Sequence, residues 1–262
     1  MWGDTNCDGT PDGYLTVDTS KEGWAMYDAD GNYLGQRGWV KPKRTYAAVE
    51  LQLNRAWDEK WAMNASYTMS WNRGNAEGPV NSDTDFDDTG RTENFDDPWV
   101  NLGGDGYLPN DRRHQFKLRG TYALTPNWQL GADVNAASGG PITGFGVGNP
   151  YDATNYHSYF ICVQNCDSPV SEDRVYERSP RGKYGRLPWT FTLNAGISYI
   201  QPFDGGEFRV KLAVYNLLNQ KHTTAVDQDL QTSISNSTSD TFRQPLGFQS
   251  PRFTQLTMSV NF

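Results

Sequence analysis

The sequence lacks any run of about 18 apolar residues, so we expect no transmembrane helix. The mean hydropathy is also low, at -0.73. Neither observation excludes a membrane protein built from strands. A transmembrane β-strand needs only about 9–11 residues and turns half of them toward lipid.

Positive charge and catalytic motifs are also scarce. The net charge of -8 argues against nucleic acid as a partner. The three histidines, at positions 114, 157 and 222, are scattered. No metalloprotease, serine-hydrolase or phosphate-loop motif occurs, and no carboxylate pair has a spacing that indicates a hydrolase. We therefore predict no catalytic residues and no enzyme activity.

The first residues, Met1-Trp2-Gly3-Asp4, have neither a basic nor an apolar region of a signal peptide. We expect the chain to be mature or a piece of something longer. Only three cysteines are present. Cys162 and Cys166 lie close together in a polar stretch, which suits a disulfide in an oxidising compartment. Three free thiols are the alternative, and Cys7 is left over.

Aromatic residues, by contrast, are abundant at 13%, with nine tryptophans. They take part in a repeated alternation of large apolar and small polar residues, the period of a β-strand with two different faces. In 61–71, Trp61, Met63, Tyr67 and Trp71 share one face. A β-sandwich gives the same alternation but has less reason to place Trp at both ends of the apolar face. The pattern predicts strands at 45–53, 61–71, 114–124, 128–136, 189–200, 208–214 and 253–262.

The connections between these segments alternate in length. Those around 56–60, 125–127 and 201–206 are short, whereas 72–111, 137–185 and 219–252 are long and polar. Transmembrane barrels have short periplasmic turns and long extracellular loops. We therefore predict an all-β fold, an antiparallel transmembrane β-barrel segment of about seven or eight meandering strands. The last residue, Phe262, is the candidate C-terminal signal for assembly of the barrel.

The charges in the predicted strands fit this fold. Lys117, Arg119, Asp133, Arg209 and Lys211 all fall on the small-polar face, where a water-filled lumen would receive them. Solvated faces of soluble strands would explain these charges equally well. Since closed bacterial barrels have even strand numbers, seven strands require a further strand in 1–43 or the rest of a larger barrel. We expect the second.

Residues 1–43 are rich in Gly and Asp, with candidate strands at 14–17 and 24–27 and a turn signal at Asp30-Gly31. We expect them to form an extracellular loop region with a short hairpin, followed by barrel in 44–262. Asp4, Asn6, Asp8 and Asp12 resemble the first part of a calcium-binding loop. The expected acidic ligand at the last position is missing, so a solvated turn cluster is the alternative.

Four motifs at strand ends resemble the barrel of TonB-dependent receptors, particularly the Oar-like group. They are Leu108-Pro109-Asn110-Asp111-Arg112-Arg113-His114-Gln115-Phe116, Gly185-Arg186-Leu187-Pro188-Trp189, Val214-Tyr215-Asn216-Leu217-Leu218-Asn219, and Ser250-Pro251-Arg252-Phe253 leading to Phe262. The resemblance extends from about residue 45 to the end.

The resemblance implies a barrel of about 22 strands in the outer membrane of a Gram-negative bacterium, with an N-terminal plug. It also implies energised uptake of a scarce ligand, namely an iron chelate, cobalamin or an oligosaccharide. Expected partners are outer-membrane lipid, the missing N-terminal barrel and plug, TonB through that missing portion, and the barrel-assembly machinery through the C-terminal strand. No cofactor is expected apart from calcium at the 4–12 loop.

Ligand contacts are expected from aromatic and arginine residues in the long loops and at strand ends. The candidates are Trp99, Tyr107, Arg112, Tyr151, Tyr156, Tyr159 and Arg186. Packing within the loops is the alternative for the aromatic residues, and pairing with loop acids is the alternative for the arginines. A different class of function, a secreted all-β calcium-dependent carbohydrate-binding module, would bury the apolar face of 61–71 against a second sheet.

Overall fold

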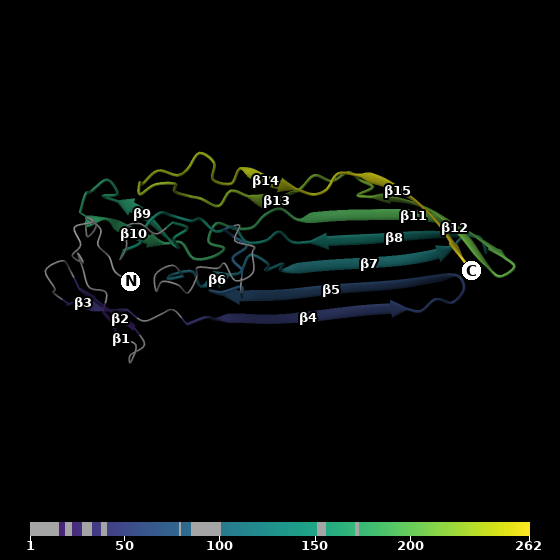
Figure 1. Ribbon diagram of the computed structural model, residues 1–262, viewed down its shortest axis with the longest axis horizontal. Helices are drawn as coiled ribbons and strands as arrows, with labels where there is room; N and C mark the ends of the chain where they lie inside the picture. Colours follow the sequence, from purple (N-terminus) through teal and green to yellow (C-terminus); the bar gives the residue numbers. More distant parts are fainter. Residues whose placement is uncertain are drawn as a thin grey trace.

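The computed structural model describes residues 41–78, 80–84, 101–150, 156–170 and 173–262, together with the backbone of three short strands nearer the N-terminus. All regular secondary structure in these parts is β-strand. The described residues include no helix that is long and apolar enough to cross a membrane. Figure 1 shows the long strands lying side by side along the longest axis of the molecule.

One antiparallel sheet, which we call the wall, contains every strand predicted between 45 and 262. The strand order is β15-β12-β11-β8-β7-β5-β4, so wall strands that follow one another along the chain are neighbours in the sheet. The two-residue β6 pairs antiparallel with the end of β5. The strands are β4 (Arg44–Arg55), β5 (Trp61–Gly74), β6 (Gly106–Tyr107), β7 (His114–Ala123), β8 (Trp128–Ala137), β11 (Thr190–Phe203), β12 (Gly206–Tyr215) and β15 (Phe253–Asn261). The predicted all-β, antiparallel, meandering fold is confirmed.

The wall has a short-turn end and a long-loop end. Figure 1 places the turns β4–β5, β7–β8 and β11–β12 at the end where the chain terminates, with the long connections at the other. The tightest turn needs only Asp204 and Gly205 between β11 and β12, and Gly205 adopts a φ of 91° there. Glycine reaches this left-handed region without a steric penalty.

The strand register keeps the two faces of the wall separate over its whole width. Apolar residues stand beside apolar residues: Trp61 beside Tyr122, Leu118 beside Val134, and Leu212 beside Leu256. On the opposite face Lys117 stands beside Asn135, and Arg209 beside Ser259. Because side chains alternate with period two, a register slip of one residue would mix the faces.

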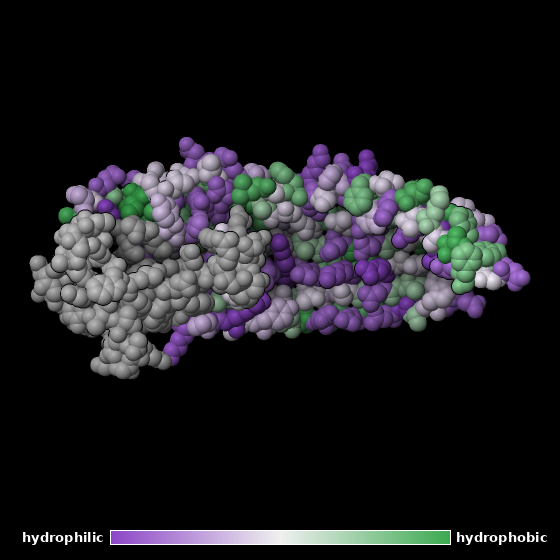
Figure 2. Space-filling model, viewed as in Figure 1, coloured by the Kyte–Doolittle hydropathy of each residue, from purple (hydrophilic) through white to green (hydrophobic). Residues whose placement is uncertain are grey.

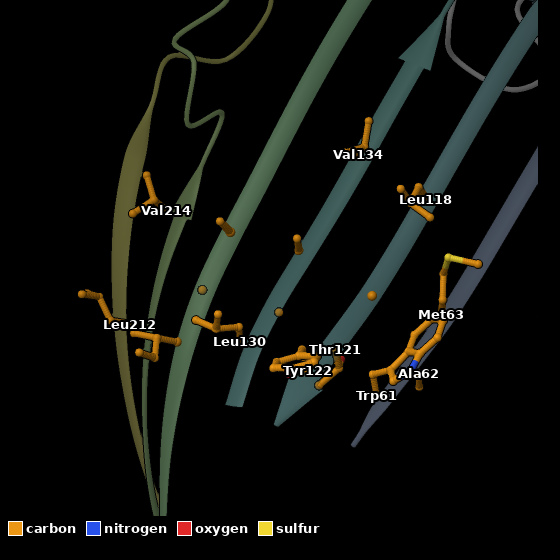
Figure 3. A pocket seen from close by; sticks show the side chains of 16 residues that line it. Trp61, Ala62, Met63, Leu118, Thr121, Tyr122, Leu130, Val134, Leu212 and Val214 are labelled. Atoms are coloured by element: carbon orange, nitrogen blue, oxygen red, sulfur yellow. The ribbon is translucent and has the colours of Figure 1, made fainter. Parts of the chain in front are cut away.

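The apolar face is hollowed near its middle (Figure 3). A cavity of about 690 Å³ lies where Gly120, Ala132 and Ala195 stand in register on β7, β8 and β11. Larger side chains such as Leu118 and Tyr122 border it. Figure 2 shows hydrophilic side chains over the middle of the sheet on the face that it displays, and a hydrophobic group at the short-turn end.

The long loops contain two hairpins that the sequence pattern does not predict. The second loop holds a hairpin of β9 (Phe160–Gln164) and β10 (Val175–Arg178), and the third a hairpin of β13 (Thr223–Val226) and β14 (Pro245–Phe248). Most of the fully buried side chains also belong to these loops, including Leu108, Phe145, Tyr159 and Arg181. The loops therefore form a packed layer at one end of the wall.

Nearer the N-terminus, β1 (Thr16–Asp18), β2 (Gly23–Tyr27) and β3 (Tyr33–Arg37) pair antiparallel in a sheet of their own. These strands overlap the two candidate strands predicted there and add a third. The Asp30-Gly31 turn lies outside the described residues. The assignment of 1–43 to an extracellular loop region stays a prediction.

Candidate functional site

Three of the predicted ligand-binding residues, Tyr107, Arg112 and Arg186, meet where the loop layer joins the wall. Between them lies Asp111, whose side chain is fully buried and pairs with Arg186 and with Arg113. Its Oδ1 lies 3.1 Å from Nη2 of Arg186, and its Oδ2 lies 3.6 Å from Nη2 of Arg113. The backbone N–H of Asn72 donates to Oδ2 at 3.2 Å. One carboxylate thus ties β5, the first loop and the second loop together.

Tyr107 lies at the centre of a group of arginines. The guanidinium carbons of Arg73, Arg113 and Arg186 lie 4.8, 5.1 and 5.2 Å from the centre of its ring. These are distances at which a cation is attracted to an aromatic ring. Hydrogen bonding to the Arg113 guanidinium lowers the pKa of the Tyr107 hydroxyl, against the opposing effect of its burial. We call Arg73, Tyr107, Asp111, Arg113 and Arg186 the arginine cluster.

Arg112 lies beside the arginine cluster and is partly buried. Its Nη1 donates to the carbonyl oxygen of Ser138 at 3.4 Å. Burial lowers the pKa of this guanidinium, and repulsion from Arg186 lowers it further. Arg186 itself donates to the backbone oxygens of Asp111 and Gly139 at 2.9 and 3.2 Å. Arg186 therefore pairs with a loop acid, Asp111, which is the alternative considered for the arginines.

Tyr159 lies in the core of the loop layer. Its ring is 2% exposed, packs against Phe145, and lies 4.9 Å from the guanidinium carbon of Arg181. Arg181 forms a buried ion pair with Asp83, which joins the second loop to the first. Burial raises the pKa of the Tyr159 hydroxyl. Tyr159 thus packs within the loops, which is the alternative considered for the loop aromatics.

The remaining loop candidates are exposed or outside the described residues. Tyr156 is 71% exposed and stands apart from the arginine cluster in the sequence. Trp99 and Tyr151 lie outside the described residues, as do Asp4, Asn6, Asp8 and Asp12 of the calcium-loop prediction. In the part of the chain that the structure covers, no group of three or more His, Cys, Asp or Glu side chains is arranged to hold a metal ion.

The structure joins Cys162 and Cys166 in a disulfide within the second loop. Gln231 of the third loop forms two hydrogen bonds with the backbone of Cys162 in the second loop. Its Oε1 accepts from the N–H of Cys162, and its Nε2 donates to the carbonyl oxygen of Cys162. Both cysteines are buried. Phe262 follows β15 and lies edge-on to Phe203, with the ring centres 6.1 Å apart. Its role as an assembly signal stays a prediction.

Known proteins that resemble this chain include one curated relative and one solved structure. No family model matches the chain. It is 31% identical over 213 residues to the TonB-dependent transporter Oar of Myxococcus xanthus, an alignment that covers 76% of this chain and 18% of that protein. A solved structure, the ferric-catecholate import receptor Fiu from E. coli K12, aligns with a TM-score of 0.42 and 14% identity, over 89% of this chain and 22% of Fiu.

The fold is that of an antiparallel wall segment of a β-barrel, with turns at one end and folded loops at the other. The chain is a relative of the Oar-like TonB-dependent receptors, which confirms the resemblance carried by its strand-end motifs. The aligned residues make up 18% of the curated relative, so the chain spans only a fraction of that protein.

Proposed function

We propose that the chain is the C-terminal barrel part of a TonB-dependent receptor that takes up a scarce ligand across the outer membrane of a Gram-negative bacterium. An iron chelate, cobalamin and an oligosaccharide are the candidate ligand classes. In this proposal the rest of the receptor supplies the plug and the contact with TonB. The barrel-assembly machinery inserts the wall through its C-terminal strand.

The observation that carries the proposal is the uncovered apolar face of the wall. Large hydrophobic side chains on this face remain widely exposed, with Leu51 at 62%, Leu212 at 44% and Met258 at 64%. No described strand of another sheet packs on them. In water such a continuous surface would favour aggregation, whereas lipid would solvate it. A secreted sandwich module would have covered this face with a second sheet.

Aromatic side chains at both ends of the apolar face support a membrane setting. Trp128 and Tyr199 pack together at the short-turn end, with ring centres 4.9 Å apart. At the loop end, His114 stacks between Tyr67 and Trp189, with ring centres 6.1 and 5.8 Å apart. Tryptophan and tyrosine collect at both interfaces of membrane proteins because their rings are amphipathic.

The polar face supports a water-filled lumen. Asp133 lies near its middle, where Arg119 approaches to 4.0 Å and Asn194 donates to its Oδ1 at 2.6 Å. The Arg119 side chain is 80% exposed. Facing lipid at the midplane, an arginine would cost about 2–4 kcal/mol, whereas facing water it costs little.

The two edge strands support a larger barrel. The outer edges of β4 and β15 pair with no other described strand, so their backbone N–H and C=O groups are open on that side. Unpaired backbone groups cost several kcal/mol each in lipid. In the proposed receptor, further strands pair with both edges and close a barrel of about 22 strands.

The proposal is tested by expressing the full-length receptor that contains this chain and following heat-modifiable migration in SDS. We expect a detergent-dependent protein from the outer-membrane fraction that migrates as a compact band until it is boiled. A protein that is monomeric without detergent and shows no such band would contradict the proposal. That result would favour the secreted calcium-dependent carbohydrate-binding module.

A further inference from the structure

The arginine cluster lies on the apolar side of the wall, not on the lumenal side. On β5, Trp61, Met63, Tyr67 and Trp71 follow the apolar face, and Arg73 continues the same alternation one step beyond Trp71. Tyr107 pairs directly with Arg73 and shares its face. Arg113 lies over the Trp71 ring at 5.1 Å as well as over Tyr107. The apolar face therefore ends in aromatic rings with guanidinium groups on them.

Positive charge exceeds negative charge in this cluster. Among the described residues, Arg73, Arg113 and Arg186 approach Tyr107, and Asp111 is the one carboxylate that pairs with any of them. Arg186 is held by Asp111 and two backbone oxygens, so it positions the loops. Arg73 forms no ion pair with a described carboxylate. Nε of Arg113 is buried and donates to no described acceptor.

Guanidinium groups in this arrangement suit a phosphate. Arginine presents a fork of donors that matches phosphate oxygens, and it is less strongly hydrated than lysine. Arg73 from β5 and Arg113 from the strand end before β7 offer donors to an anion from two directions. On the lipid-facing side, at the level of the interfacial aromatic rings, such an anion belongs to a lipid head group.

We propose that Arg73 and Arg113, supported by Trp71 and Tyr107, bind the phosphate of a lipid head group in the outer leaflet of the membrane. This inference rests on the proposed function, because it requires the apolar face to lie in the bilayer. The acyl chains of the same lipid would lie along the apolar face below Trp71. Arg186 and Asp111 are positioning residues that fix Tyr107 and Arg113.

The test uses the full-length receptor in mild detergent, with native mass spectrometry of bound lipid. Lipid A and its dephosphorylated form are compared on the wild type and on Arg73→Gln. The matched control is Arg119→Gln, an exposed arginine on the lumenal face of the same sheet. We expect phosphorylated lipid to bind in preference, with about fivefold weaker binding to Arg73→Gln and unchanged binding to Arg119→Gln.

Several outcomes would overturn the inference. Equal losses in both variants would indicate general attraction by positive charge, and equal binding of the two lipids would exclude phosphate recognition. Competition by inorganic phosphate at the same affinity as the lipid would assign the site to a free anion. Heat-modifiable migration is measured on every sample. A receptor that inserts but shows no lipid preference contradicts this inference alone, whereas one that never forms a barrel contradicts the proposed function.

Discussion

The wall and the loop layer bury their side chains in opposite ways. The wall places its largest hydrophobic residues on an open face, where Leu51 and Met258 are more than half exposed. The loop layer encloses Leu108, Phe145 and Tyr159 almost completely. One chain thus combines a closed core in its loops with an open apolar face on its wall. The wall therefore depends on its surroundings for stability, whereas the loops contain a core of their own.

We expect the largest difference in stability between the loop layer and the wall when the buried ion pair of the loop layer is removed. Replacing Arg181 with Met leaves Asp83 buried without its partner, which costs about 3–5 kcal/mol of local stability. We expect rapid proteolysis of the loops in intact outer membranes while heat-modifiable migration of the barrel persists. The control is Lys183→Ala, which removes an exposed ion pair with Glu177 and costs about 0–1 kcal/mol. Equal protease resistance of both variants would contradict this account of the loop layer.

A charge on the apolar face is expected to damage the wall instead. Leu118→Lys places a charge near the middle of β7 on the face that the proposed function puts in lipid, where we expect a loss of about 2–4 kcal/mol in the free energy of unfolding. The matched control, Thr68→Lys, lies on the polar face of the neighbouring strand beside Glu50. Urea titrations in liposomes measure both. Similar unfolding free energies would show that the two faces do not differ in their surroundings.

Loss of the disulfide is expected to have a smaller, local effect. The bond closes a short loop with a sequence separation of 4. Loop-closure entropy for so short a loop is about 2 kcal/mol. The variant Cys162→Ser/Cys166→Ser should expose the second loop to protease and leave the wall intact. Protease cleavage of wild type after mild reduction gives the same comparison without mutation, and a stable loop in both experiments would contradict it.

The smallest effect is expected from acid at the short-turn end. The backbone N–H of Trp61 donates to Asp58 and is the largest cause that lowers the pKa of this carboxyl below 3.8. A lowered pKa in the folded state contributes stability above the unfolded pKa, and that stability is lost as pH falls through the folded value. Asp58→Asn should therefore lower stability slightly at neutral pH and flatten its acid dependence below about pH 4. Unfolding midpoints across that range test this, and an unchanged acid dependence would count against the turn hydrogen bonds.

The alternation of apolar and polar residues predicts the strands of the wall. The arginine cluster depends on contacts between residues far apart in the sequence, which no local pattern predicts. Seven long segments with period-two patterns form wall strands, because side chains of a strand alternate between two faces and the two faces of this wall differ in polarity. The hairpins β9–β10 and β13–β14 are too short to show it. The sequence singles out Arg112 and Arg186 by their places at strand ends, and Tyr107 as an aromatic residue of a long loop. Asp111 belongs to one of the strand-end motifs, but nothing in the sequence indicates its pairing with Arg186, which is 75 positions away.

The central claim is that the apolar face of the wall lies in lipid and the polar face in water. Spin labels at Val134→Cys and Asn135→Cys test it directly, since these neighbours on β8 face opposite sides. The full-length receptor in liposomes, with Cys7 replaced by Ser, is the sample. We predict that the label at 134 collides more with oxygen, which concentrates in lipid, and the label at 135 more with a water-soluble nickel complex. Equal access of both labels to the nickel complex would contradict the claim.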